Sequence, residues 1–234
     1  MSILRVHIEE AGYEREKATI HQINFDIKKN ELVGMIGANG AGKSTTIKGI
    51  LGQLSYVKGK ISEINEIRYS YVPERPIFYD ELTLWEHIEF VAAVEKLEER
   101  DIVDVKQLLR KFKLTKHIHQ FPNNFSKGMQ QKAMIALALL TKPELLIIDE
   151  PFIGLDPNAT KLLLHLLNIE KQKGTSILLC THVLDTAQRI CDRFLIIEKG
   201  TLKASGTLAE VLNQCGAEEQ DLYACIAMEE EEDE

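Results

Sequence analysis

Residues 37–44 read G-x-x-x-x-G-K-S, a pattern whose residue types suit the binding of phosphate groups. An apolar run at 32–36 predicts a buried strand before it, and apolar residues follow with the spacing of one helix face: Ile47, Ile50, Leu51 and Leu54. Glycines let backbone N–H groups converge on phosphate oxygens, while the lysine reaches the β- and γ-phosphates and the serine holds Mg²⁺. We therefore expect a nucleoside triphosphate and Mg²⁺ to bind at Gly37, Ala38, Asn39, Gly40, Ala41, Gly42, Lys43, Ser44 and Thr45.

An apolar run that ends in two carboxylates follows about a hundred residues later, at positions 145–150. The carboxyl end of a strand is where an open α/β sheet places its ligand chemistry. Asp149 is therefore expected to hold Mg²⁺ through water, and Glu150 to polarise or deprotonate an attacking water. The alternative is a solvated strand end without chemistry.

A second helix start suited to a phosphate is predicted at Ser126. Serine is a favoured N-cap residue, and Gly128 leaves the first turn open to an anion. Because the phosphate loop already serves the nucleotide of this chain, we expect Ser126 and Gly128 to act on the nucleotide of a partner chain.

The elements that must position these residues follow an α/β pattern. Two β-like runs open the chain, and a helical pattern extends from about residue 73 to 141. Short, continuously apolar runs then return, as expected for strands buried on both faces of a parallel sheet, at 145–148, 177–180 and 194–197. This order predicts an α/β nucleotide-binding core interrupted by a helical insert.

Composition argues against several classes of protein. The net charge is −8, and residues 229–234 are all acidic, so the body carries about −2 (−8 plus 6) and lacks the basic footprint of a nucleic-acid-binding protein. No apolar stretch approaches the ~20 residues that span a bilayer, and the first residues do not resemble a secretory signal. The acidic run is expected to be a solvated tail, and an interaction role is the alternative.

The cysteines and one histidine pair offer weaker signals. Cys180, Cys191, Cys215 and Cys225 form no C-x-x-C pair, so we expect reduced thiols in the cytosol rather than disulfides or a metal site. His117-x-His119 lacks further ligands at a suitable spacing and is expected to be an exposed helix end.

Together and in this order, the motifs resemble the nucleotide-binding subunit of an ATP-binding cassette (ABC) transporter. The resemblance adds Gly154-Leu155-Asp156 as the D-loop and Thr181-His182 as the switch. It implies ATP hydrolysis with Glu150 as general base, His182 holding the γ-phosphate and the lytic water, and Asp156 communicating between two sites. Tyr13, 30 residues before Lys43, stands where the family stacks an aromatic ring on adenine; a buried or turn tyrosine is the alternative.

The resemblance also fixes the expected organisation of the chain. We expect a P-loop NTPase core of the ABC ATPase type with an N-terminal antiparallel β subdomain and an inserted α-helical subdomain. The expected ranges are a single domain over 1–228, with the β subdomain at 3–30, the core at 31–72 and 142–212 and the insert at 73–141, followed by the acidic tail at 229–234.

The sequence departs from the usual family pattern in the signature and at Glu74. The signature reads Phe-Ser-Lys-Gly-Met at 125–129 instead of Leu-Ser-Gly-Gly-Gln, but it keeps the serine and the second glycine. Glu74 replaces a glutamine that contacts Mg²⁺ and links the site to the membrane subunit. We expect Glu74 to keep the coupling role and to contact Mg²⁺ only in a closed dimer; a solvent-facing loop acid is the alternative.

Three segments (71–76, 125–129 and 221–223) are similar to those of the Ecs-type subfamily of bacterial ATPases, which pair with a separate membrane subunit. That similarity implies an exporter, with peptides as one class of cargo. It further implies a homodimer that lies peripherally on the cytoplasmic face of the membrane and docks a polytopic membrane subunit through Trp85 and Phe90 of the insert. The alternative for these two aromatic residues is a place in the core.

Two other functions compete with this reading. A soluble ABC-type ATPase acting on ribosomes or DNA would need two cassettes or a long coiled coil, whereas only 82 residues separate Lys43 from Ser126. A small-molecule P-loop kinase would leave Ser126, Gly128 and His182 unexplained.

Overall fold

The chain, seen as a computed structural model, is described over residues 1–15, 17–62, 64–216 and 221–226. The acidic tail expected at 229–234 lies outside the described residues.

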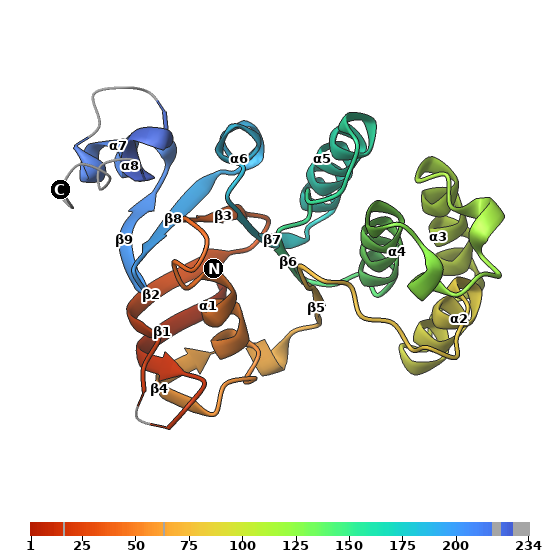
Figure 1. Ribbon diagram of the computed structural model, residues 1–234, viewed down its shortest axis with the longest axis horizontal. Helices are drawn as coiled ribbons and strands as arrows, with labels where there is room; N and C mark the ends of the chain where they lie inside the picture. The colour runs from red at the N-terminus through yellow and green to blue at the C-terminus, as the bar shows by residue number, and fades with distance from the viewer. Residues whose placement is uncertain (16, 63, 217–220, 227–234) are drawn as a thin grey trace.

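Two sheets form the framework of the molecule (Figure 1). The larger sheet has the strand order β5-β6-β7-β3-β8-β9, in which the first five strands run parallel and β9 is antiparallel to β8. Its strands are β3 (Leu32–Ile36), β5 (Tyr69–Val72), β6 (Leu145–Asp149), β7 (Ser176–Thr181), β8 (Arg193–Glu198) and β9 (Thr201–Gly206). The smaller, antiparallel sheet has the order β2-β1-β4, with β1 (Ser2–Gly12), β2 (Ile20–Lys28) and β4 (Tyr56–Ser62).

The central strands are the short apolar runs of the sequence. Every residue of β3, β6 and β7 is buried, as a strand covered on both faces requires. The predicted α/β fold with a parallel core and an antiparallel β unit is thereby confirmed.

The strand β4 differs from the expected organisation. Its residues fall within the range expected for the core, 31–72, but β4 pairs antiparallel with β1, from Gly12↔Tyr56 to Arg5↔Ser62. The reason is its composition: β4 contains Lys58 and Lys60, and two lysines could not be buried at the centre of a parallel sheet. Both side chains are exposed in the antiparallel sheet.

Helices cover the larger sheet and form a separate group at one side of it (Figure 1). That group contains α2 (Leu84–Val94), α3 (Glu99–Lys111) and α4 (Lys127–Leu140), with the short turns η2 (Thr115–His117) and η3 (Pro122–Asn124). The remaining helical elements are α1 (Lys43–Ile50), η1 (Ile64–Glu66), α5 (Pro157–Gln172), α6 (Leu184–Ile190), α7 (Leu208–Cys215) and α8 (Tyr223–Ile226).

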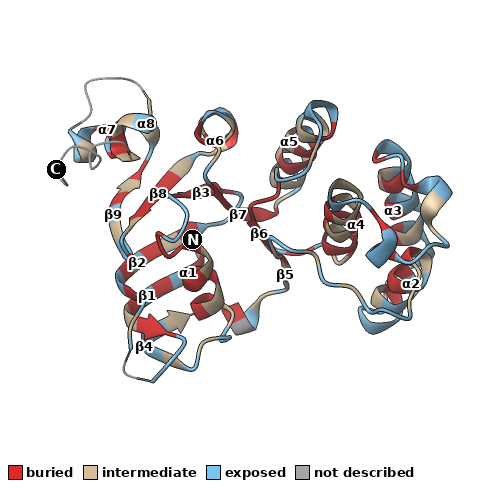
Figure 2. Cartoon of the chain, in the orientation of Figure 1, coloured by how far each residue is buried: buried red, intermediate tan, exposed pale blue. Residues whose placement is uncertain are grey.

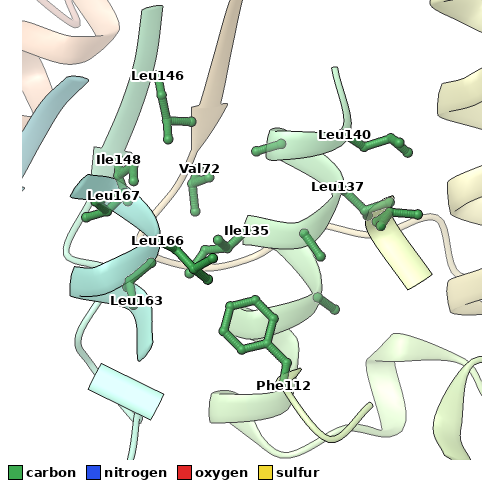
Figure 3. Packing of buried hydrophobic residues seen from close by; sticks show 14 of the residues in the cluster. Val72, Phe112, Ile135, Leu137, Leu140, Leu146, Ile148, Leu163, Leu166 and Leu167 are labelled. Atoms are coloured by element: carbon green, nitrogen blue, oxygen red, sulfur yellow. The ribbon is translucent and has the colours of Figure 1, made fainter. Parts of the chain in front are cut away.

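A continuous apolar cluster ties the helical group to the sheet. Buried residues run from the strands into the helices in Figure 2, and Figure 3 shows the contact from close by. Side chains of β5 and β6 meet those of α5 and α4 there, with Phe112 beneath them: Val72, Leu146, Ile148, Leu163, Leu166, Leu167, Ile135, Leu137 and Leu140. Since α4 carries Ser126 at its start, this cluster fixes that helix relative to the core.

The expectation of four reduced thiols is wrong for one pair, because a disulfide joins Cys215 to Cys225. Their Cα atoms lie 5.3 Å apart where α7 and α8 pack together, a contact that cysteine spacing alone does not reveal. Cys180 and Cys191 are free, and burial raises the pKa of each thiol, so neither is set up as a nucleophile. Across the described ranges, no helix combines the length and the apolar character needed to cross a membrane.

Candidate functional site

The phosphate loop connects β3 to α1 at the carboxyl edge of the larger sheet. Gly42 takes φ 109° and caps α1 without any side-chain hydrogen bond, so the first N–H groups of the helix keep their capacity to bind an anion. Gly37 must be glycine for a different reason, since a Cβ there would lie 2.2 Å from the carbonyl oxygen of Ile197. The loop conformation therefore depends on both glycines.

A cavity of about 290 Å³ opens over this loop and collects residues from four separate segments of the chain. Its walls are Asn39, Gly40, Gly42, Lys43, Ser44, Thr45, Glu74, Glu150, Ile153 and His182. Nine of these ten positions are among the site residues predicted from the sequence; Ile153, three residues beyond Glu150, was not predicted. The structure thus brings together residues that the sequence spreads over more than 130 positions.

Lys43 is buried and engaged within the loop itself. Its Nζ donates to the carbonyl oxygens of Gly37 at 2.8 Å and Ala38 at 3.1 Å, and it lies 3.6 Å from Glu150 Oε1. A phosphate group that enters the cavity can take over these contacts, because it offers more negative charge to the same ammonium group.

Glu150 sits between Lys43 and the switch histidine. The residue has a positive φ of 48°, its backbone N–H donates to Cys180, and the backbone N–H of His182 donates to Oε2 at 3.3 Å. Oε1 is buried and accepts no hydrogen bond from the described residues, although His182 Nδ1 lies only 3.0 Å away. A buried carboxylate oxygen with free lone pairs is suited to accept a proton from a water molecule.

The environment of the Asp149 carboxylate indicates whether the site suits Mg²⁺. Its Oδ1 is buried without a hydrogen-bond partner in the described part of the chain, and burial raises the pKa of its carboxyl group. The charges of Glu150 and Glu74 raise this pKa further, while a hydrogen bond with Ser44 and the charge of Lys43 lower it. A divalent cation would reduce the repulsion among the three carboxylates, so Ser44, Asp149 and Glu74 form a suitable set of oxygen donors.

Tyr13 lies beside the loop and is half exposed, which excludes the alternative of a buried tyrosine. Its hydroxyl lies 3.3 Å from Thr45 Oγ1, and Lys48 Nζ lies 5.0 Å from the centre of the ring. A flat, accessible ring next to a phosphate loop can stack on a base. Lys48 was not predicted, and its only sequence signal is its position one helical turn beyond Thr45.

The start of α4 lies apart from this cavity. Ser126 is its N-cap, as predicted, and accepts from the backbone N–H of Met129 at 3.3 Å. Gly128 packs so closely on Gly154 that a Cβ would lie 2.4 Å from the Gly154 carbonyl oxygen. In the described residues, neither Ser126 nor Gly128 lines the cavity of Lys43, so a single chain does not bring them to its own phosphate loop.

Asp156 follows this contact and caps α5. Its carboxylate accepts from the backbone N–H of Ala159 at 2.9 Å, which lowers its pKa, and Lys132 Nζ lies 3.4 Å away. Within a single copy of the chain, the D-loop and the start of α4 are therefore in direct contact through Gly128 and Gly154.

The aromatic residues of the insert take different positions. Trp85 is partly buried against the apolar cluster, and its Nε1 donates to Glu89. Phe90 is about half exposed and packs edge-on against Tyr79. His117, one of the histidine pair, lies near Gln120, and the described residues hold no cluster of three or more potential metal ligands.

Comparisons with known proteins agree on one family. Residues 20–153 match the family model described as ABC transporter. An uncharacterized ABC transporter ATP-binding protein of Bacillus subtilis (strain 168), YthP, is 49% identical over 226 residues, which cover 96% of this chain and 95% of that protein. The ABC-type transporter ATP-binding protein EcsA of the same organism is 42% identical over 249 residues, covering 98% of each.

Solved structures give the same answer. A structure described as the ATP binding subunit of an ABC transporter superposes with a TM-score of 0.88 at 42% identity, covering 96% of this chain and 98% of that one. The cbiO1 protein of Clostridium perfringens, described as part of the ABC transporter complex cbiONQ, superposes with a TM-score of 0.73 at 26% identity, with 91% of each chain covered.

Proposed function

Because this chain belongs to the ABC transporter family and is an ATP-binding subunit of the kind that hydrolyses ATP, we propose that it drives a separate membrane subunit of an exporter. The observation that carries the proposal is the cavity that Lys43, Ser44 and Glu150 line beside His182, with the Asp149 carboxylate hydrogen-bonded to Ser44 at its edge. The proposed working unit is a homodimer of this chain, on the cytoplasmic face of the membrane, bound to a polytopic membrane subunit.

ATP is proposed to bind along the loop and the start of α1. The adenine would stack on Tyr13, and the phosphates would lie against the N–H groups of residues 37–45, with Lys43 leaving its carbonyl partners to meet them. Ser44 and Asp149, joined by Glu74 when the dimer closes, would hold Mg²⁺, which neutralises charge on the β- and γ-phosphates.

Hydrolysis would then use Glu150 and His182. Glu150 Oε1 has no hydrogen bond from the described residues and would take a proton from the attacking water. His182 lies within contact distance of this carboxylate and would hold the γ-phosphate and the water in line. Departure of Lys43 toward the phosphates would free Glu150 at the same moment, so the base becomes available only when nucleotide is bound.

A second copy would complete each site. Ser126 and Gly128 lie outside the cavity of their own chain but present the capped start of a helix, which suits a γ-phosphate bound by another copy. Asp156 would report the state of one site to the other, since it lies close beyond Gly154 in the loop that Gly128 contacts. After hydrolysis, electrostatic repulsion across the interface would open the dimer.

Export rests on the resemblance to the Ecs-type subfamily; the similarity to EcsA over nearly the full chain supports the assignment to that subfamily. Peptides remain the proposed class of cargo. The exposed residues of α2, Phe90 among them, are proposed to face the membrane subunit.

The decisive test of the catalytic proposal is Glu150→Gln. The variant should still dimerise with ATP but hydrolyse it at least about a hundredfold more slowly, because the amide cannot accept the proton. Glu144→Gln is a matched control at the opposite end of the region around β6, where Glu144 is exposed and accepts from the backbone N–H of Arg68. Wild-type turnover in Glu150→Gln would remove this residue from the mechanism.

The partner is tested by an affinity capture of the protein from detergent-solubilised membranes of its own organism. Recovery of one polytopic membrane protein supports the transporter. Recovery of ribosomal or DNA-associated proteins instead would favour a soluble ABC-type ATPase.

A further inference from the structure

The disulfide between Cys215 and Cys225 connects the last residue of α7 to the short helix α8. The two cysteines differ in access, because Cys225 is 1% exposed whereas Cys215 is only partly buried. Gly216 ends α7 in the left-handed conformation, with φ 69°, so the chain turns away from the helix directly after Cys215. A reagent in solution can therefore reach the pair through Cys215.

The attachment of α8 to the rest of the molecule is small. A helix of four residues is too short to be stable in water by itself, so its position depends on tertiary contacts. Leu222 and Cys225 supply such contacts, because both are buried in an apolar cluster that also contains Ile36 of β3 and Ile196 of β8. The disulfide adds a covalent link to α7, which packs on β8 and β9 (Figure 1).

This apolar cluster reaches the base of the phosphate loop. Ile36 is the last residue of β3, and the loop begins at the next position, Gly37. Leu222 and Cys225 of α8 therefore belong to the same cluster as the residue that precedes the loop. Because packed interiors transmit small displacements, a change in the position of α8 can alter the position of Gly37.

A second cavity, of about 300 Å³, lies between α8 and the phosphate loop. Its lining consists of residues 38–41 of the loop, residues 196–199, and Cys225 and Ile226 of α8. Asn39 and Gly40 also line the nucleotide cavity, so they divide the two spaces. Gly40 has φ 82°, and no described atom lies within 4 Å of the place where its Cβ would be, so side-chain packing does not hold the loop at this point. Without α8 as its wall, the second cavity would open to solvent and this part of the loop could move away from the phosphates.

Reduction of the pair is a thiol–disulfide exchange whose co-reactant is a protein dithiol. One thiolate of the dithiol attacks the accessible sulfur of Cys215, the bond between the two sulfurs breaks, and Cys225 leaves with the electron pair and takes up a proton. The second thiol of the reductant then displaces Cys215, which takes up the second proton, and the reductant closes its own disulfide. The pair thus gains two electrons and two protons, and the dithiol loses the same number. Disulfides in the cytosol are usually transient or redox-sensing, so the proposed location of this chain favours such an exchange.

We infer that Cys215 and Cys225 form a redox switch of nucleotide binding: as a disulfide they hold α8 against the base of the phosphate loop, and as two thiols they let α8 detach. The inference rests on the proposed binding of ATP along this loop, but not on export or on a membrane subunit. An apparent affinity falls with the fraction of molecules that are in the binding-competent state. We expect α8 to stay attached in about one tenth of the reduced chains, so that the Kd for ATP rises about tenfold on reduction.

The test compares the full chain in its two redox states. One sample is oxidised with glutathione disulfide and the other is reduced with dithiothreitol, and alkylation followed by peptide mass spectrometry establishes the state of the pair in each. After removal of the reagents, ATP binding is titrated by calorimetry, and hydrogen exchange is followed at residues 221–226. In the reduced sample the Kd should be about tenfold higher, and exchange at these residues should be about tenfold faster.

Two variants assign the response to this pair of cysteines. Cys215→Ser cannot form the disulfide but leaves the buried Cys225 in its cluster, so under both conditions it should bind ATP as the reduced wild type does. Cys191→Ala removes a cysteine outside the pair and should keep the full response. Since the wild type itself provides both redox states, the test does not depend on the folding of a variant.

Several results would overturn the inference: equal Kd values in the two wild-type states, unchanged exchange at residues 221–226, or a pair that stays reduced in glutathione disulfide. A redox response that persists in Cys215→Ser would also overturn it, because the effect would then come from another group. Failure of both states to bind ATP would overturn the proposed nucleotide site and the switch with it, whereas the exchange result would still report how the disulfide holds α8.

Discussion

Replacing Gly128 with alanine should disable the start of α4 while leaving the protein folded. A Cβ at this position would lie 2.4 Å from the carbonyl oxygen of Gly154, whereas real Cβ atoms essentially never approach within 3.0 Å. The two backbones must therefore separate by at least about 0.6 Å (3.0 minus 2.4). Because both partners are backbone, no side chain can move aside to absorb the change.

The effect on stability should be small because two contributions oppose each other. Alanine gains about 1 kcal/mol over glycine in a helix, and the steric strain costs about 1–3 kcal/mol. The net loss of about 0–2 kcal/mol corresponds to a fall in Tm of up to about 8 °C for a chain of this size. The effect on turnover should be larger, since a displacement approaching 1 Å at a catalytic site can reduce the rate by about a hundredfold. We expect ATP hydrolysis to fall by about ten- to a hundredfold.

The assay compares steady-state ATP hydrolysis, ATP-dependent dimerisation and Tm in Gly128→Ala and in a matched control. Gly49→Ala is that control, because Gly49 is also helical but its Cβ would meet only the ends of two side chains, Ile8 at 3.3 Å and Leu54 at 3.6 Å. The control should keep its activity and its stability. Wild-type hydrolysis and dimerisation in Gly128→Ala would refute the argument that the contact with Gly154 positions the start of α4.

Three further predictions concern the nucleotide site and the disulfide. Burial raises the pKa of the Asp149 carboxyl group, so the folded state binds the proton of this group more tightly than the unfolded state does. The free energy of unfolding therefore falls as pH rises from the pKa of the unfolded state through the pKa of the folded state. Urea unfolding should thus find Asp149→Asn more stable than wild type at pH 8 without nucleotide, but not at pH 4; equal stability at both pH values would contradict this. Tyr13→Ala should weaken ATP binding about tenfold or more, as loss of one base-stacking contact implies, while Tyr13→Phe binds normally in a titration. Replacing Cys215 and Cys225 with serine should lower the free energy of unfolding by about 2–3 kcal/mol, because the disulfide closes a loop of about ten residues; a reducing agent should destabilise the wild type but not this variant.

The sequence predicted the fold wherever the signal was local. Continuous apolar runs identified the buried strands β3, β6 and β7 because a strand covered on both faces has no polar side. The N-cap at Ser126 could be predicted from residue type, since a serine hydroxyl before a helix commonly accepts a hydrogen bond from a backbone N–H of the first turn. Signals of this kind need no knowledge of distant residues.

What the sequence did not predict depends on contacts between distant segments. The exposed residues of β4 leave it no apolar signal, and only its pairing with β1 places it in the antiparallel sheet. The disulfide depends on how α7 packs on α8, and cysteine spacing does not report this packing. Likewise, no local pattern indicates that Gly128 rests on Gly154.

The order of strands in the larger sheet has a consequence for how the chain is made. The strand that leads into the phosphate loop, β3, lies between β7 and β8, and Leu32 pairs with Ile177, a residue 145 positions later (177 minus 32). At roughly 5–20 residues per second, a ribosome needs about 7–30 s to supply that neighbour. During this interval β3 is an apolar strand with two open edges, the kind of segment that chaperones protect from aggregation. We therefore expect a nascent chain to bind nucleotide only after β7 and β8 have been synthesised, so that nucleotide binding would mark completion of the parallel strands.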